Sequence, residues 1–96
     1  YVAARTAHGW QTRMFAPEVG VVEDPATGSA AVSFAGSLAA HVEGYGVDGT
    51  HDVVIHQGVE MGRPSRIRVQ VYDDRDQLVP RVTGAAVRVF EGTLDA

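Results

Sequence analysis

The chain has 96 residues, of which 45% are hydrophobic and 21% charged, and its formal net charge is -4 at pH 7. This length and composition indicate one folded domain, and the excess of acidic over basic residues excludes the basic surface that binding to a nucleic acid duplex requires. The chain has no cysteine and no apolar run long enough for a membrane helix. We therefore expect a cytoplasmic protein, with no nucleic acid or membrane as partner and without disulfides or thiolate metal sites.

The first quarter of the chain is predicted to be extended. Tyr1–Ala4 is a short apolar run, and Trp10–Phe15 alternates loosely between apolar and polar residues, which is typical of β-strands. Val21–Val22 then leads into an acidic pair followed by Pro25. Because the residue before a proline avoids the helical region, Asp24 is also expected to be extended.

One helix is predicted, at Ala30–His41. Ala30, Phe34 and Leu38 recur at four-residue spacing and fall on one face. The opposite face carries two serines and little else that is polar. A helix that is apolar almost all round is usually buried, so we expect this one to lie inside a curled sheet or a barrel.

After a glycine-rich loop at residues 44–49, the hydrophobic pattern changes to a period of two. Three segments alternate in this way: Val53–His56, Arg66–Val71 and Val87–Phe90. Leu78–Val82 can add a short strand, which Pro80 confines to a sheet edge, and the three aspartates among residues 73–76 predict a hairpin turn. The predicted fold is α+β, with mostly antiparallel strands and one buried helix in a single domain, residues 1–96.

The segment Glu23–Ser29 places an acidic pair and a small-residue loop directly before the helix. The first turn of a helix presents unpaired N–H groups and the positive end of the helix dipole. Gly28 and Ser29 leave that end unobstructed, so a carboxylate or phosphate can bind there, and Asp24 can accept a hydrogen bond or transfer a proton. The structural alternative is that Thr27 or Ser29 only caps the helix.

A second unusual segment, Gln57–Ser65, lies between two predicted strands. Gly58 and Gly62 permit positive φ or close backbone approach, and Arg63 can hold a carboxylate with two hydrogen bonds. The alternative is a glycine-containing connection with a solvated arginine. The four histidines lack the spacing of metal ligands, so no metal site is predicted.

Taken together and in order, these motifs resemble the C-terminal half of the PhzF-like family of phenazine-biosynthesis isomerases, which has a diaminopimelate-epimerase-like fold. The matching segments are Arg13–Pro17, Glu23–Ala30, Gln57–Gly58, Met61–Ser65 and Gly84–Val87. The resemblance implies a protein of two lobes, each a sheet curled around a central helix, with the active site between them. Residues 1–96 would form the C-terminal lobe.

The resemblance also implies a reaction. The phenazine enzyme of the family isomerises a dihydro-hydroxyanthranilate by moving a proton, without a cofactor or metal, and its principal acid/base glutamate lies in the N-terminal lobe. We therefore predict that Asp24 is catalytic and that Thr27, Gly28, Ser29 and Arg63 bind the substrate. The lack of cysteine agrees with this family, because the related diaminopimelate epimerases and proline racemases use a pair of thiols.

The expected function is thus cofactor-independent general acid/base proton transfer on a small carboxylate-bearing substrate. The expected partners are an N-terminal lobe, in the same or another chain, and further copies in a homo-oligomer. Without the other lobe, the isolated chain is not expected to be active. The alternatives are a non-catalytic module that binds small anions at the helix end and a structural half with a vestigial site.

Overall fold

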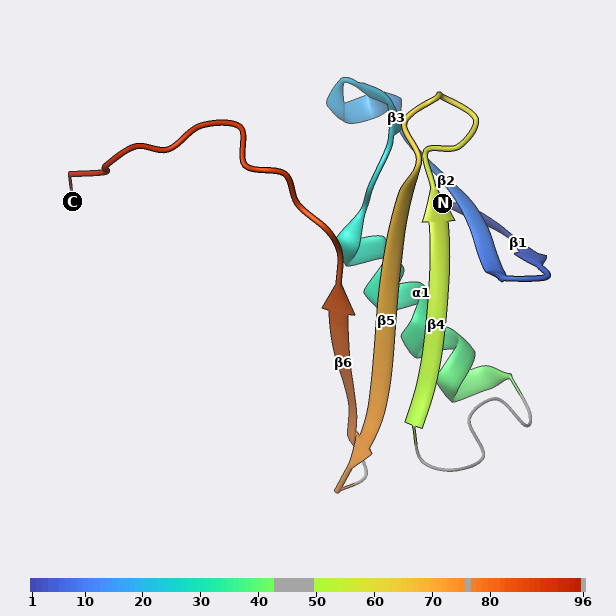
Figure 1. Ribbon diagram of the computed structural model, residues 1–96. Helices are drawn as coiled ribbons and strands as arrows, with labels where there is room; N and C mark the ends of the chain where they lie inside the picture. Colours follow the sequence, from blue (N-terminus) through green and yellow to red (C-terminus); the bar gives the residue numbers. More distant parts are fainter. Residues whose placement is uncertain (43–49, 76, 96) are drawn as a thin grey trace.

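The computed structural model describes residues 1–42, 50–75 and 77–95 (Figure 1). Its elements follow the chain in this order: strands β1 (Val2–Thr6) and β2 (Gly9–Ala16), a short 3₁₀ helix η1 (Pro17–Val19), strand β3 (Val21–Asp24), helix α1 (Gly28–His41), and strands β4 (Thr50–Gln57), β5 (Ser65–Asp74) and β6 (Gln77–Thr83). A mostly stranded chain with one α-helix confirms the α+β class. No helix of the described residues is long and apolar enough to cross a membrane.

The strands form a mixed sheet in the order β1-β2-β4-β5-β6, and β3 pairs with β2 outside this path. β2 and β4 run parallel, whereas the other neighbouring pairs are antiparallel. Parallel neighbours need a crossover connection, and α1 lies within the segment that connects them. The crossover places α1 against one face of the sheet, behind β4, β5 and β6 in Figure 1.

The core lies between α1 and the central strands. Ala31, Ala35 and Leu38 are buried and form a stripe along one side of the helix. They pack against five aliphatic side chains of the central strands: Val53, Ile55, Ile67, Val69 and Val71. Trp10 and Phe34 extend this core with an edge-to-face contact, in which the ring centroids are 5.0 Å apart.

The expectation that α1 is buried on all sides is wrong for the described residues. Ser29, Ser33 and Ser37 are exposed, and they lie on the side of the helix that faces away from the core. The predicted apolar face does pack on the sheet, but the described strands cover only that side. A serine face can remain in water at little cost, so the pattern of small residues indicated a buried stripe and not a fully enclosed helix.

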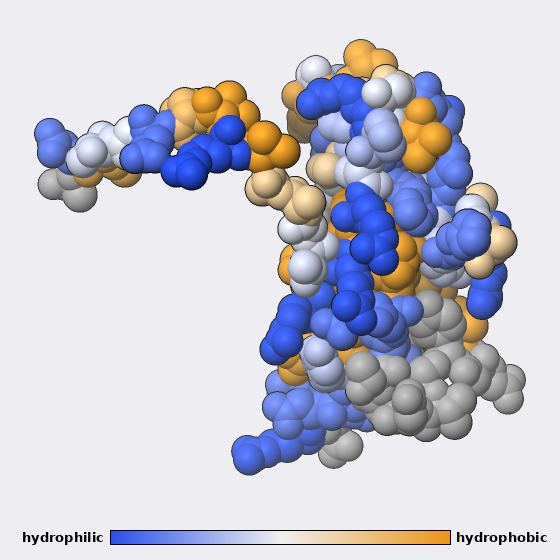
Figure 2. All heavy atoms as spheres, in the orientation of Figure 1, coloured by the Kyte–Doolittle hydropathy of each residue, from blue (hydrophilic) through white to orange (hydrophobic). Residues whose placement is uncertain are grey.

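The face of the sheet away from α1 is polar. On it, Arg68 of β5 donates hydrogen bonds to Asp52 of β4, with an Nε–Oδ1 distance of 3.0 Å. Arg81 of β6 lies over the ring of Tyr72, 5.4 Å from its centroid. Figure 2 shows the hydrophilic residues spread over this side of the molecule. The alternation predicted for these strands is therefore confirmed, with one face in the core and one in water.

The edge strand at Leu78–Val82 is confirmed as β6, and Pro80 pairs with Val71 at the edge of the sheet. The hairpin turn predicted at residues 73–76 is supported by the pairing of Asp74 with Gln77, although Asp76 is outside the described residues. The glycine-rich loop predicted at residues 44–49 also lies outside the described residues.

The strand predicted at Val87–Phe90 is wrong, since residues 84–95 form no regular element. Val87 and Val89 are each 86% exposed and Phe90 is 88% exposed. Figure 1 shows this segment leading away from the sheet after β6, and Figure 2 shows apolar side chains along it. A strand needs a neighbour for its backbone hydrogen bonds, and no described strand pairs with these residues. We call residues 84–95 the C-terminal segment.

Candidate active site

The turn between β3 and α1 brings the acidic motif to the N-terminus of the helix. β3 ends at Asp24, which pairs with Met14 of β2, and Pro25 stops the strand from continuing. Thr27 occupies the N-cap position with an extended backbone, and its carbonyl accepts the first helical hydrogen bond from Ala31 at 3.1 Å. We call residues 24–29 the β3–α1 turn.

The structural alternative, that Thr27 or Ser29 caps the helix, is confirmed for the position of Thr27 but not for its side chain. No side chain makes a capping hydrogen bond at this helix end. The Thr27 hydroxyl instead donates to Oδ2 of Asp24 at 2.6 Å. The Thr27 amide donates to Oε1 of Gln57 at 3.3 Å, so both donors of Thr27 are used within the protein. Thr27 therefore belongs to the site as the residue that contacts Asp24, and it has no donor left for a ligand.

Gln57 is the residue of this site that sequence reasoning missed. It is the last residue of β4 and its side chain is fully buried. Nε2 donates to the carbonyl oxygen of Asp24 at 2.7 Å and to Oγ1 of Thr27 at 2.9 Å. A weak signal is present in the sequence, because Gln57 continues the buried alternation of Val53 and Ile55 and a buried amide needs partners.

The connection between β4 and β5 supports the turn from the other side. Gly58 has a φ of +80°, and a Cβ there would lie 2.2 Å from the carbonyl oxygen of Arg63 and 2.9 Å from that of Pro25. The hydroxyl of Ser65 donates to the Pro25 carbonyl at 2.8 Å. The close approach predicted for Gly58 is confirmed, and it packs this connection against the β3–α1 turn.

The start of α1 is open. Gly28 is exposed, and a Cβ added to it would have no atom within 4 Å. Ser29 is also exposed, in the first turn of the helix. A ligand can therefore approach the N–H groups of this turn without displacing a side chain. Such groups, together with the helix dipole, favour a carboxylate or phosphate.

Arg63 is brought to the same side of the fold but not into contact with Asp24. Its amide closes the connection by donating to the Gly58 carbonyl at 2.9 Å. Its side chain is exposed and forms no hydrogen bond or ion pair with the described residues. The Arg63 backbone thus helps to close the connection that supports Pro25, and the Arg63 guanidinium remains available to bind a ligand.

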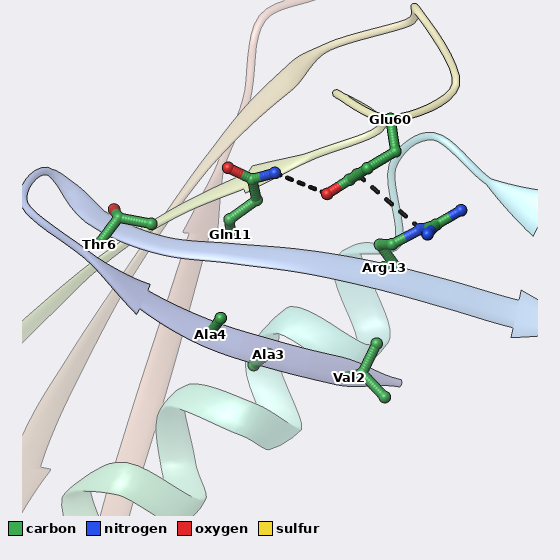
Figure 3. A pocket seen from close by; sticks show the side chains of 7 residues that line it. All are labelled: Val2, Ala3, Ala4, Thr6, Gln11, Arg13 and Glu60. Atoms are coloured by element: carbon green, nitrogen blue, oxygen red, sulfur yellow. Dashed lines mark hydrogen bonds and ion pairs between the residues drawn. The ribbon is translucent and has the colours of Figure 1, made fainter.

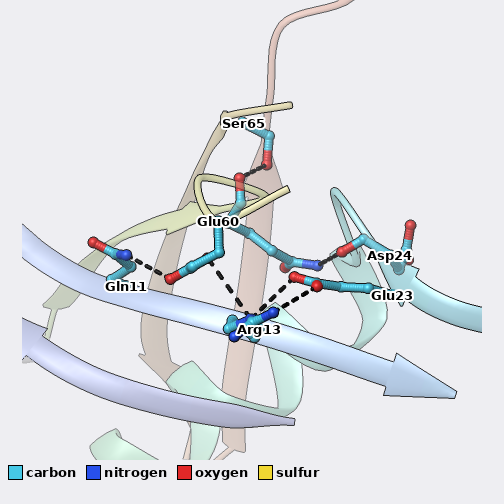
Figure 4. Close-up of polar contacts among 7 residues, drawn as sticks. Gln11, Arg13, Glu23, Asp24, Glu60 and Ser65 are labelled. Atoms are coloured by element: carbon cyan, nitrogen blue, oxygen red, sulfur yellow. Dashed lines mark hydrogen bonds and ion pairs between the residues drawn. The ribbon is translucent and has the colours of Figure 1, made fainter. Parts of the chain in front are cut away.

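The two acidic residues of the motif have different surroundings. Glu23 receives two hydrogen bonds from Arg13, at 3.2 Å and 2.8 Å, and its side chain is 11% exposed. The Glu23 carboxylate raises the pKa of Arg13 above its ordinary value. Glu60 lies 3.9 Å from Nε of Arg13, and its pKa is lowered chiefly by a hydrogen bond from Gln11 (Figure 4). Of the acidic pair, only Asp24 contacts the turn at the helix end.

A pocket of about 380 Å³ lies beside this charged group, on the face of the sheet opposite α1 (Figure 3). It is lined by seven residues of β1, β2 and the β4–β5 connection: Val2, Ala3, Ala4, Thr6, Gln11, Arg13 and Glu60. None of the predicted site residues lines it. The described residues also contain no cluster of three or more His, Asp or Glu side chains suited to a metal ion.

Comparison with known proteins links these residues to a family. The family model named phenazine biosynthesis-like protein matches residues 1–92. A trans-2,3-dihydro-3-hydroxyanthranilate isomerase of Pseudomonas chlororaphis is 44% identical over 87 residues, which are 88% of this chain and 30% of that protein. An uncharacterized isomerase of Mesorhizobium japonicum is 44% identical over 86 residues, or 88% of this chain and 28% of that protein.

A third relative, the trans-2,3-dihydro-3-hydroxyanthranilate isomerase of Pseudomonas aeruginosa, is 54% identical over 59 residues, or 60% of this chain and 20% of that protein. The chain thus spans less than a third of the length of the curated relatives that it matches. The match over most of the chain confirms the resemblance to the family, which the ordered motifs had indicated.

Proposed function

We propose that this chain, which belongs to the phenazine biosynthesis-like protein family, forms one lobe of an isomerase that moves a proton by general acid/base catalysis. The substrate would be a small molecule that carries a carboxylate, and no cofactor would be needed. The observation that carries this proposal is the position of Asp24, which the Thr27 hydroxyl contacts at 2.6 Å beside the open N-terminus of α1.

Each residue of the turn has a distinct proposed role. The amides of Gly28 and Ser29, with the Ser29 hydroxyl, would hold the substrate carboxylate in the field of the helix dipole. Asp24 would then accept or return a proton at a neighbouring carbon of the substrate. Arg63 would stabilise the connection that packs on Pro25 or add a second contact to the anion.

A second lobe would complete the site. The chain spans less than a third of the two-lobe length expected from its relatives, and a proton shift between two carbons usually uses more than one titratable group. The described chain also leaves apolar side chains of the C-terminal segment exposed. Exposed apolar surface of this kind favours association with another lobe or another copy of the chain.

The test is the variant Asp24→Asn, assayed for turnover of trans-2,3-dihydro-3-hydroxyanthranilate with both lobes present. The amide keeps the shape of the side chain but cannot accept a proton, so we expect turnover to fall by about 10²–10⁴-fold. Asp52→Asn is the matched control, because it removes the same charge from the polar face of the sheet. Equal turnover of Asp24→Asn and the control would remove Asp24 from the mechanism.

The second candidate is a non-catalytic module that binds small anions. The open end of α1 favours it, because anion binding needs only Gly28, Ser29 and the helix N–H groups. Calorimetric titration of the chain with 3-hydroxyanthranilate separates the two functions when it is combined with an exchange assay. Tight binding of 3-hydroxyanthranilate, with no exchange of the protons of trans-2,3-dihydro-3-hydroxyanthranilate into deuterated water when the second lobe is present, would favour the module over the isomerase.

A further inference from the structure

Gln57 is placed so that it can act on Asp24 without touching a substrate. Its backbone is fixed at the end of β4, between Thr12 of β2 and Ser65 of β5. Its side chain is 0% exposed and reaches from the sheet to the β3–α1 turn, which lies 30 residues earlier in the sequence at Thr27. A buried primary amide must be satisfied by hydrogen bonds, and here the hydrogen-bond partners of its side chain among the described residues all belong to the turn.

The partners of the Gln57 amide determine which end is oxygen. The Thr27 amide can only donate, so the atom opposite it is Oε1. The Asp24 carbonyl can only accept, so the atom 2.7 Å from it is Nε2. The second N–H of Nε2 is then directed to the Thr27 hydroxyl oxygen, at 2.9 Å. One orientation of the amide satisfies every contact, whereas the flipped orientation would set donor against donor at the Thr27 amide and acceptor against acceptor at the Asp24 carbonyl.

The Thr27 hydroxyl continues this chain of hydrogen bonds. Its oxygen accepts an N–H from Gln57, and it donates its own proton to Oδ2 of Asp24, at 2.6 Å. Asp24 must accept this bond, and Oδ1 has no hydrogen-bond partner among the described residues. The chain of bonds commits one carboxylate oxygen to the protein and leaves the other for a ligand.

We propose that Gln57 is the positioning residue of the site, which acts through the Thr27 hydroxyl to hold Asp24 in the hydrogen-bond-accepting carboxylate form with Oδ1 free. This inference rests on the proposed proton-transfer function and deepens it, because it explains how Asp24 is oriented for a substrate. Loss of the Thr27 bond would leave the position of the carboxylate less defined.

The test compares Gln57→Met and Thr27→Val with Thr27→Ser, in the isomerase assay with both lobes present. Gln57→Met keeps the length of the side chain without the amide, and Thr27→Val keeps the shape without the hydroxyl. Each is expected to lower kcat by about 10–100-fold, because the base is less well positioned. KM is expected to change by less than about threefold, because the groups that hold the carboxylate remain.

Rescue by the conservative variant separates positioning from simple stability. Gln57→Met and Thr27→Val remove a hydrogen bond of the chain that ends on Asp24, so both are expected to be slow although folded. Thr27→Ser retains a hydroxyl and is expected to keep kcat within about threefold of wild type. Urea unfolding identifies variants that fail to fold, and if Gln57→Met is one, the two Thr27 variants still decide the matter.

Two results would overturn the inference. One is a wild-type kcat in every folded variant that lacks the amide or the hydroxyl. The other is a Thr27→Ser variant as impaired as Thr27→Val, because the methyl group and not the hydroxyl would then be important. Failure of the proposed function itself looks different, since Asp24→Asn would then keep wild-type turnover.

Discussion

The substitution Gly58→Ala tests the packing that supports the β3–α1 turn. Gly58 has a φ of +80°, and an added Cβ would lie 2.2 Å from the Arg63 carbonyl oxygen and 2.9 Å from that of Pro25. Neither atom is the end of a flexible side chain, so the backbone of the connection or of the turn must move. Gly62→Ala is the matched control, because Gly62 also has a positive φ, of +71°, but a Cβ there would meet nothing within 4 Å.

The two substitutions differ in one energetic term. Placing an alanine at positive φ costs about 1–2 kcal/mol, and both variants carry this cost. Overpacking against fixed atoms adds about 1–3 kcal/mol, and only Gly58→Ala carries it. We therefore expect the free energy of unfolding to fall by about 2–5 kcal/mol for Gly58→Ala, against about 1–2 kcal/mol for Gly62→Ala.

Urea unfolding followed by the fluorescence of Trp10, the single tryptophan, measures both values. With a slope of about 1–3 kcal/mol per M for small proteins, an excess loss of 2 kcal/mol lowers the midpoint by about 1 M. Equal losses for the two variants would refute the reasoning, because they would show that the connection does not press on Pro25. The Gly58 variant should also bind 3-hydroxyanthranilate more weakly than the Gly62 variant.

Three further predictions concern other parts of the fold. Ala35→Leu should lower the free energy of unfolding by about 1–3 kcal/mol, because Ala35 is fully buried, whereas Ala40→Leu on the exposed side should be nearly neutral in the same urea assay. The Arg68 hydrogen bond lowers the pKa of Asp52, so Asp52→Asn should cost a few tenths of a kcal/mol at pH 7, and that difference should vanish as the pH falls through the lowered pKa. Deleting the C-terminal segment, residues 84–95, should leave the unfolding midpoint of the chain unchanged and weaken its association with a second lobe, measured by sedimentation.

The sequence predicted the parts of the fold that depend on local pattern. The alternation in Val53–His56 and Arg66–Val71 corresponds to β4 and β5, which the structure extends at both ends. The stripe through Leu38 corresponds to the buried face of α1. Period and spacing are properties of a single segment, so they can be read without knowing what the segment packs against.

The wrong predictions concern features that the local sequence pattern does not determine. Val87–Phe90 alternates like a strand, but alternation does not supply a neighbour for the backbone, and the C-terminal segment has none in the described chain. The small residues of α1 predicted complete burial, although its serine side is exposed. A hydrophobic pattern indicates which side chains are suited to burial. Tertiary structure determines how many other elements pack around a helix or strand.

The candidate site, like the fold, could be predicted from the sequence only in part. The motif Glu23–Ser29 and its place before the helix were visible in the sequence, because a proline, a glycine and a helix start lie within a few residues. The contact of Gln57 with Asp24 was not visible, because it depends on the parallel register that sets Thr12 of β2 beside Gln57. The Arg13–Glu23 pair was missed for a similar reason, since it joins residues of neighbouring strands.

The most direct test of the account is deuterium incorporation from deuterated water into trans-2,3-dihydro-3-hydroxyanthranilate, followed by mass spectrometry. The chain would be used with its second lobe present, as wild type and as Asp24→Asn. The account predicts incorporation by the wild type and a loss of about 10²-fold or more in the variant, because the carboxylate transfers the proton. Incorporation at the same rate in both proteins would contradict the claim that the β3–α1 turn is part of a proton-transfer site.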